Sequence, residues 1–447
     1  MQVINSLQGK TILLVNTGSI KKKFIVERLK ELGLKIIALH KEKNWAESLV
    51  DHFIIADNNN HAEAITAVER FMVRHPDLKI EGALTFWEQD VVLTSKIVDK
   101  FGFIGIPLTI SSQVRNKYLF REFCRNNNLP APKHKLIKNK EDLDYIARNF
   151  TFPCVIKPTC GAASLFVIKI ENTYELVKFY NYLKDNLCKR EEAVIRESDI
   201  LVEEYIDGDE VDIDILVQNG EIRYYSITDN FKTREPYFVE TGQIIPSLLP
   251  GNNQDELISM AKSTLEKLRV KNGCIHFEAK STKNGAVPIE VNLRMGGDEV
   301  WSFVKGAWGC DLVENAAKIA LGIDMGRIER GAKPNMYLMG QYFLPDFSGH
   351  LATFNVNEDI YGKKYLYDFQ LFKQEGDAIF APPEGYDYLG WVTVKANNAA
   401  EAQLNMQNAF SHFHYRIDKF TKENTSPQLW RAFENLRQLR SVVYANA

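Results

Sequence analysis

Residues 274–294, CIHFEAKSTKNGAVPIEVNLR, alternate apolar and polar side chains in two runs separated by a short loop. Successive side chains of a strand point to opposite faces, so a period of two in both runs predicts a β-hairpin with one apolar and one polar face. The apolar positions are Ile275, Phe277 and Ala279 in the first run and Val287, Ile289, Val291 and Leu293 in the second. We predict that the apolar face is core and that the polar face is a functional surface.

The loop of this hairpin sets which polar residues face each other. If residues 283–285 form a three-residue loop with Gly285 in the left-handed conformation, Thr282 pairs with Ala286. The same register then places Glu278 directly opposite Glu290. Two opposed carboxylates repel each other unless a cation lies between them.

A divalent cation between these two glutamates is therefore expected. Mg²⁺ prefers hard oxygen ligands from one or two carboxylates together with phosphate oxygens. Asn292 lies roughly 6.8 Å along the strand from Glu290 and adds an amide oxygen. Arg294 continues the same face with a planar group suited to phosphate. We predict that Glu278, Glu290 and Asn292 are metal ligands; the alternative is a solvated hairpin with incidental acids.

The composition indicates a globular protein whose phosphate binding must be local. With 447 residues the chain should fold as several domains, and 45% hydrophobic and 25% charged residues are ordinary for a soluble protein. The net charge of -3 gives no bulk attraction to nucleic acid or to a membrane surface. We find no signal-peptide pattern, no span-length apolar run and no CxxC pair among the six cysteines, and expect a cytoplasmic protein with reduced thiols.

The sequence divides into three parts that differ in their predicted order of strands and helices. Residues 1–112 alternate strands and helices and predict a parallel α/β domain; the turn VNTGSIKK lacks GxGxxG, which argues against a nicotinamide site. Residues 113–330 predict a domain with an antiparallel central sheet that includes three strands in residues 200–227, and a small lid subdomain at about 133–202. Residues 331–447 predict a C-terminal α+β domain, with strand, helix and strand in residues 390–417.

Further residues suited to bind a nucleotide precede the hairpin. Lys117 opens a predicted helix and Lys157 ends the strand FPCVIKP. The loop after that strand consists of small residues, among them Gly161, Ala162, Ala163 and Ser164. Strand residues around an acidic turn could meet an adenine edge and ribose hydroxyls; these are Glu203, Glu204, Ile206 and Glu210. Each signal is weak by itself, and an acidic hairpin surface is the alternative for the last group, but their order along the chain is informative.

In this order the set resembles the ATP-grasp superfamily of carboxylate-amine ligases. Segments such as TFWEQDVVLTSKIVDKFG, VETGQIIPSLLP and IEVNLRMGGDEV look most like the branch of carnosine synthase and the bacterial L-amino-acid ligases, which make dipeptides. The segment GWVTVKANNAAEA is similar to a C-terminal domain shared with biotin carboxylase. The resemblance implies an ATP-grasp fold, ATP, and two Mg²⁺ ions with Mn²⁺ as the alternative. The single glycine of the phosphate loop, Gly161, departs from the family pattern.

The resemblance also implies a reaction. A substrate carboxylate, expected to come from an amino acid, would take the γ-phosphoryl group of ATP, and an amine would displace phosphate from the acyl phosphate to give an amide or dipeptide. Arg294, Lys157 and Lys117 would neutralise charge at the transferred phosphoryl group. Substrate contacts are expected from five residues: Glu240, Gly296, Gly297, Asp298 and Glu299. A biotin-carboxylase-like reaction and a non-catalytic ATP-binding module remain alternative functions. A homodimer is a possible assembly.

Overall fold

The computed structural model describes residues 6–188, 198–297, 299–326, 328 and 330–434. The chain forms two compact units. Unit 1 consists of Met1–Ala131, Val211–Ile227 and Leu249–Lys333, and unit 2 of Pro132–Glu210, Thr228–Leu248 and Pro334–Ala447. None of the helices formed by the described residues combines the length and the apolar composition that crossing a membrane requires.

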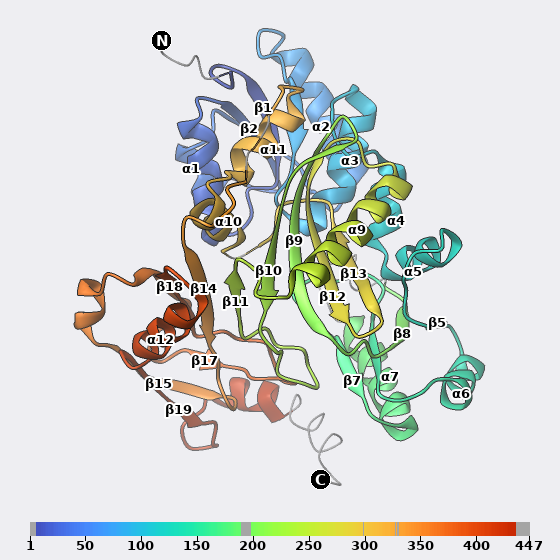
Figure 1. Cartoon of the computed structure of the whole chain (residues 1–447), viewed down its shortest axis with the longest axis vertical. Helices are drawn as coiled ribbons and strands as arrows, with labels where there is room; N and C mark the ends of the chain where they lie inside the picture. The colour runs from blue at the N-terminus through green and yellow to red at the C-terminus, as the bar shows by residue number, and fades with distance from the viewer. Residues whose placement is uncertain (1–5, 189–197, 298, 327, 329, 435–447) are drawn as a thin grey trace. The chain divides into compact units, whose positions relative to one another are not determined.

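A parallel sheet with the strand order β3-β2-β1-β4 begins unit 1, as the sequence predicts (blue in Figure 1). The strands β1, β2 and β4 are largely buried, whereas the edge strand β3 is partly exposed. Leu13, Val15, Ile37 and Leu39 share one core with Leu93 of α3. The elements are β1 (Thr11–Val15), η1 (Ile20–Lys22), α1 (Lys23–Glu31), β2 (Lys35–His40), η2 (Trp45–Ser48), β3 (His52–Ile55), α2 (His61–Arg74), β4 (Gly82–Leu84), η3 (Glu88–Asp90) and α3 (Val91–Phe101).

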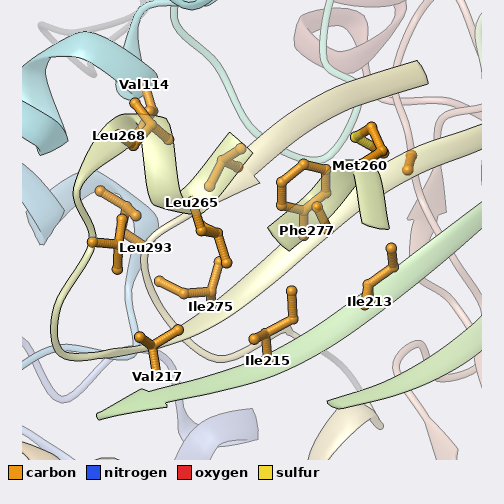
Figure 2. Packing of buried hydrophobic residues seen from close by; sticks show 14 of the residues in the cluster. Val114, Ile213, Ile215, Val217, Met260, Leu265, Leu268, Ile275, Phe277 and Leu293 are labelled. Atoms are coloured by element: carbon orange, nitrogen blue, oxygen red, sulfur yellow. The ribbon is translucent and has the colours of Figure 1, made fainter. Parts of the chain in front are cut away.

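The second part of unit 1 is built on the neighbouring strands β13, β12, β9 and β10. Helix α9 presents apolar residues at helical spacing to this sheet, and Figure 2 shows them above the apolar face of the strands. The labelled side chains include Met260, Leu265 and Leu268 of α9, Ile213, Ile215 and Val217 of β9, and Ile275 and Phe277 of β12. The elements are α4 (Leu108–Arg115), α5 (Lys117–Asn126), β9 (Asp209–Gln218), β10 (Glu221–Asn230), α9 (Gly251–Leu268), β12 (Gly273–Thr282), β13 (Gly285–Asn292), α10 (Val300–Trp308) and α11 (Leu312–Ala320).

The hairpin of β12 and β13 confirms the predicted pairing of Glu278 with Glu290, but the predicted loop is wrong. Thr282 pairs with Gly285, whose φ is +106°, so the loop contains two residues rather than three. The register shifts again at a β-bulge, where Ile289 is the extra residue on β13. The two deviations cancel, and the glutamates therefore face each other as predicted.

The bulge also changes which residues of β13 belong to the core. Val291 and Leu293 are buried in it, as predicted, but Val287 and Ile289 are only half buried, because the extra residue reverses the alternation on their side of the bulge. The buried Arg121 of α5 donates from Nη2 to the carbonyl oxygen of Ile289, at 2.9 Å. The predicted single apolar face is therefore correct only on one side of the bulge.

The first sheet of unit 2 has the order β5-β8-β6-β7 and is antiparallel. The three strands predicted in residues 200–227 exist, but β8 belongs to the sheet of β5 and β6 rather than to the predicted central sheet with β9 and β10. Alternation and turn residues indicate where strands end and leave their partners undetermined, which explains the error. The elements are β5 (His134–Ile137), α6 (Lys140–Asn149), β6 (Cys154–Pro158), β7 (Ile168–Ile170), α7 (Thr173–Leu187) and β8 (Ile200–Glu204).

The remainder of unit 2 contains the strand order β11-β14-β18-β16 and a three-stranded sheet, β17-β15-β19. The predicted strand, helix and strand after residue 390 are confirmed as β18, α12 and β19, and Asn398 caps α12 by accepting from the backbone N–H of Glu401 at 2.9 Å. The elements are β11 (Gly242–Ile245), β14 (Tyr337–Phe343), β15 (Gly349–Val356), η4 (Glu358–Gly362), β16 (Leu366–Leu371), β17 (Ala378–Ile379), β18 (Gly390–Ala396), α12 (Ala399–Phe410) and β19 (Phe413–Lys419).

Candidate active site

The polar face of the hairpin brings together the three predicted metal ligands. Glu278 and Glu290 are directly opposed, and Asn292 donates from Nδ2 to Oε1 of Glu278 at 2.9 Å. Asn292 is 2% exposed, so its amide is held in place and its Oδ1 is the atom suited to a metal. Two carboxylates and one amide oxygen are a donor set that fits Mg²⁺. Among the described residues there is no group of three or more His, Cys, Asp or Glu side chains that could hold a metal.

Lys117 lies beside this set. Helix α5 begins at Lys117, and the preceding Asn116 caps it by accepting from the backbone N–H of Leu119 at 3.1 Å. The ammonium group of Lys117 is 3.0 Å from Oε1 of Glu290, and the lysine is 7% exposed. One positive charge therefore already lies beside Glu290, which places Lys117 where it could neutralise phosphate bound at the hairpin.

Arg294 follows β13 and is held by residues of the N-terminal part of unit 1. Its Nε is 2.8 Å from Oε2 of Glu88, and its Nη1 donates to the carbonyl oxygen of Met295 at 2.9 Å. Oε1 of Glu88 is 3.3 Å from Nε of Arg115. Arg294 was predicted as a site residue, but Glu88 and Arg115 were not, because both are far from Arg294 in the chain and no local spacing links them to it.

A buried cluster of one histidine and two aspartates lies next to Asn292 in the sheet. His276 pairs with Asn292 across the strands, its Nδ1 is 2.9 Å from Oδ1 of Asp214, and its Nε2 is 3.7 Å from Oδ1 of Asp212. Burial opposes protonation of His276, but the two carboxylates outweigh it and raise its pKa to about 9. The sequence analysis missed these roles, although the alternation of residues 211–217 would have placed both aspartates on one face.

The glycine segment after Arg294 approaches this cluster. A Cβ atom on Gly296 would lie 2.7 Å from Nδ1 of His276, so only glycine fits there, whereas a Cβ atom on Gly297 would have no neighbour within 4 Å. Glu299 accepts from the hydroxyl of Ser302 at 2.8 Å and is partly engaged in the start of α10. Asp298 lies outside the described residues, and its predicted substrate role stays a prediction.

In unit 2, Lys157 and Glu203 form a buried ion pair. Their Nζ and Oε2 atoms are 2.6 Å apart, and the two residues are 5% and 3% exposed. They come from the paired strands β6 and β8, where Val155 faces Glu203 and Lys157 faces Leu201. Glu203 thus fixes the position of the Lys157 ammonium group, a contact that the sequence analysis did not predict.

The end of β8 and the residues up to the start of β9 contain the other predicted nucleotide contacts. Glu204 bonds with the backbone of Lys133, while Ile206 and Glu210 are half buried. Tyr205, which directly follows Glu204, donates to Oε1 of Glu235 at 2.7 Å. Glu240, a predicted substrate contact, is exposed in the same unit. Roles for these residues in nucleotide or substrate binding stay predictions.

The small-residue loop after β6 adopts a strained conformation. Ala163 and Ser164 each have a φ of +52°, and Phe166 has a φ of +63°. The left-handed region costs a non-glycine residue roughly 1–2 kcal/mol. The one glycine of the loop, Gly161, does not occupy that region. The loop has only one glycine, and its left-handed positions are therefore occupied by residues other than glycine.

Comparison with known proteins identifies the central part of the chain. A family model described as the ATP-grasp domain matches residues 150–301. The chain contains an ATP-grasp domain. A second model, described as L-amino acid ligase C-terminal domain 2, matches residues 341–418. The ATP-grasp domain thus holds Lys157, Glu203 and the whole hairpin with Glu278 and Glu290.

The curated relatives have low sequence identity to this chain, and the match covers only part of their length. Carnosine synthase 1 of Gallus gallus is 27% identical over 331 residues, which cover 71% of this chain and 36% of that protein. Alanine–anticapsin ligase of Bacillus subtilis (strain 168) is 24% identical over 300 residues, 62% of this chain and 63% of that protein. The chain spans only 36% to 40% of the length of the carnosine synthases it matches.

Solved structures confirm the ATP-grasp fold. The L-amino acid ligase from Bacillus licheniformis aligns with a TM-score of 0.81 at 21% identity, covering 92% of this chain and 100% of that one. The biotin carboxylase domain of the Hydrogenobacter thermophilus 2-oxoglutarate carboxylase, solved with MgADP, ADP and bicarbonate, aligns with a TM-score of 0.67 at 19% identity over 92% of this chain and 91% of that one.

Proposed function

We propose that this protein is an ATP-dependent ligase that joins a carboxylate to an amine and gives an amide or dipeptide, ADP and phosphate. The observation that carries the proposal is the pair of opposed glutamates, Glu278 and Glu290, with Asn292 beside them on one hairpin and Lys117 of α5 paired with Glu290. The matches to an ATP-grasp domain and to an L-amino acid ligase C-terminal domain support it.

The reaction has two steps, and neither requires a nucleophilic side chain. A carboxylate oxygen of the first substrate attacks the γ-phosphorus of ATP, the bond from phosphorus to the bridging oxygen breaks, and ADP leaves. The neutral amine of the second substrate then attacks the acyl carbon, phosphate leaves, and the nitrogen gives up a proton to solvent. All reacting groups of the first step are anionic, so catalysis consists mainly of charge neutralisation and alignment.

Each residue of the candidate site has a role in this scheme. Glu278, Glu290 and Asn292 would hold two Mg²⁺ ions, with Mn²⁺ as the alternative; such ions supply neutralisation of the triphosphate charge. Lys117 and Lys157 are proposed to bind phosphate oxygens, each oriented by its glutamate partner. Arg294 is proposed to bind the transferred phosphoryl group.

The remaining nucleotide contacts are proposed for the strand β8 region and the loop after β6. Adenine and ribose would meet the segment around the acidic turn, and the phosphates would meet the loop. The residues proposed are Gly161, Ala162, Ala163, Ser164, Glu203, Glu204, Ile206 and Glu210.

We propose that both substrates are small molecules and that at least one is an amino acid. The names of the relatives, carnosine synthase and alanine–anticapsin ligase, support this class. The ammonium group of an amino acid would be bound by Glu240, Asp298 or Glu299, and Gly296 and Gly297 would admit the substrate close to the backbone. Glu240→Gln should then change the order of preference among amines.

The domain division predicted from the sequence is proposed unchanged. An N-terminal α/β domain at 1–112 precedes the ATP-grasp domain at 113–330, with its lid at about 133–202, and an α+β domain at 331–447 follows. The two family matches, at 150–301 and 341–418, fall within the second and third of these.

The test is a screen for ADP release over pairs of amino acids with Mg²⁺, followed by mass spectrometry of the product. We expect ADP and an amide to form only with particular acid and amine pairs. ADP formation that requires bicarbonate and no amine would instead favour a biotin-carboxylase-like reaction. Tight ATP binding without ADP formation in any pair would favour a non-catalytic module. Glu290→Gln should abolish ADP release, while Glu256→Gln on the exposed face of α9 is the control.

A further inference from the structure

Glu88 lies between two arginines at the end of the hairpin. One carboxylate oxygen is 2.8 Å from Nε of Arg294 and the other is 3.3 Å from Nε of Arg115. The side chains of Glu88, Arg115 and Arg294 are 9%, 6% and 12% exposed. We propose that Glu88 and Arg115 are positioning residues that aim the guanidinium group of Arg294 at the acyl phosphate. This inference rests on the proposed ligase function.

The contacts of Arg294 determine which of its edges remains available. Nη1 donates to the carbonyl oxygen of Met295 at 2.9 Å, and Nε forms an ion pair with Glu88 at 2.8 Å without the geometry of a hydrogen bond. A guanidinium group is planar, so a hydrogen bond at one nitrogen and a close opposite charge at another restrict both its position and its orientation. The third nitrogen, Nη2, therefore points in a defined direction, as a group that must bind a short-lived anion requires.

The charge of Arg294 favours an anion. Its guanidinium group is almost excluded from water, where its attraction for an anionic acyl phosphate is weakly screened. A lysine at position 294 would lack the second contact, so the arrangement specifically suits an arginine.

The turn that holds Glu88 is itself anchored. Glu88 and Asp90 belong to η3, which follows β4 at the carboxyl end of the parallel sheet. Asp90 accepts from Nδ2 of Asn16 at 2.7 Å and from Nδ2 of Asn58 at 2.8 Å, residues that follow β1 and β3. The N-terminal α/β part of unit 1 thereby fixes the turn, and the turn fixes Arg294.

Space for a small group exists next to Arg294. A cavity of about 70 Å³ is lined in part by Arg294 and Met295 and by Thr85 and Phe86, which lie just before Glu88. A direct role for Glu88 in binding a substrate ammonium group is disfavoured, because each of its oxygens already faces a guanidinium group. A purely stabilising role is a weak explanation too, since buried ion clusters often contribute little net stability.

The test compares Glu88→Gln with the wild type and measures amide formed per ADP released. If Arg294 is misaligned, the acyl phosphate is lost to water before the amine reacts, so the ratio of amide to ADP falls and kcat for amide falls on the order of 10²-fold. The KM for ATP should stay unchanged. The ratio does not depend on how much enzyme is folded, so a merely structural defect leaves it at the wild-type value.

Glu81→Gln is the matched control, because Glu81 also forms an ion pair beside β4, with Lys10 at 2.7 Å, and its described ion pair does not involve Arg294. It should leave the ratio and kcat unchanged. An unchanged ratio in Glu88→Gln, whether or not kcat falls, overturns the proposal. If Glu88→Gln does not fold, Arg115→Lys is judged by the same ratio. A wild type that forms no amide with any substrate pair contradicts the ligase function itself, which distinguishes the two failures.

Discussion

Replacing the two opposed glutamates by glutamine, one at a time, should change the stability of the free protein in opposite directions. Two unit charges about 5 Å apart, the spacing of directly opposed side chains, repel by about 3 kcal/mol at an effective dielectric constant of about 20. Lys117 lies 3.0 Å from Glu290 and offsets part of this repulsion. Glu278→Gln keeps an acceptor for Asn292. We therefore expect this substitution to raise the free energy of unfolding by about 1–2 kcal/mol.

Glu290→Gln has the opposite expected effect. It removes the partner of Lys117, a lysine that is 7% exposed. An unpaired buried ammonium group costs about 3–5 kcal/mol. Relief of the repulsion with Glu278 recovers part of that cost. The net expectation is a decrease in the free energy of unfolding of about 2–3 kcal/mol.

Denaturant unfolding monitored by tryptophan fluorescence, with and without Mg²⁺ and a non-hydrolysable ATP analogue, measures both effects. The wild type should gain stability when the metal and nucleotide are added, and both variants should lose most of that gain, because each lacks one ligand. Equal destabilisation by the two substitutions in the absence of metal would refute the charge argument. A full Mg²⁺-dependent gain in either variant would refute the metal site.

Three further outcomes are expected. A Cβ atom on Gly340 would lie 1.9 Å from the ring of Trp391. Gly340→Ala should therefore lower the free energy of unfolding by about 3 kcal/mol in denaturant titrations, and an effect below about 1 kcal/mol would contradict the packing. Ala163 has a φ of +52°, so Ala163→Gly should leave thermal stability unchanged or raise it. The control Ala162→Gly should cost about 0.5–1 kcal/mol by the same thermal measurement, and equal losses in both variants would contradict the strain. Burial raises the pKa of Asp90 to about 6 from 3.8, so the folded state holds the proton more tightly and stability falls as pH rises through this interval. Relative to Asp90→Asn, the wild type should lose about 1–2 kcal/mol between about pH 5 and pH 8, and parallel pH profiles would contradict the shift.

The hairpin of β12 and β13 shows which structural features an alternating sequence pattern can predict. Alternation predicted both strands and the pairing of Glu278 with Glu290. It did not predict the two-residue loop or the bulge at Ile289, because both depend on how the backbone fits its neighbours, such as the contact of Arg121 with the bulge carbonyl. The pairing was predicted correctly although the assumed loop was wrong.

Partners of charged residues were the least predictable feature of the candidate site. Lys157 was identified from its place at the end of a strand, but its contact with Glu203 depends on the pairing of β6 with β8. Arg294 was identified from its position after Asn292, but Glu88 lies in a turn after a different sheet. Such contacts join distant segments, and no local spacing encodes them.

The sequence by itself determined the residue types that can bind a metal and phosphate, the strands and helices that carry them, and their order along the chain, because these follow from local periodicity and side-chain chemistry. Only the tertiary structure decided that Lys117 faces Glu290 and that Glu88 contacts Arg294. The physical reason is that the position of a buried charge depends on which opposite charges the folded chain brings close to it, and this is a property of packing rather than of local sequence.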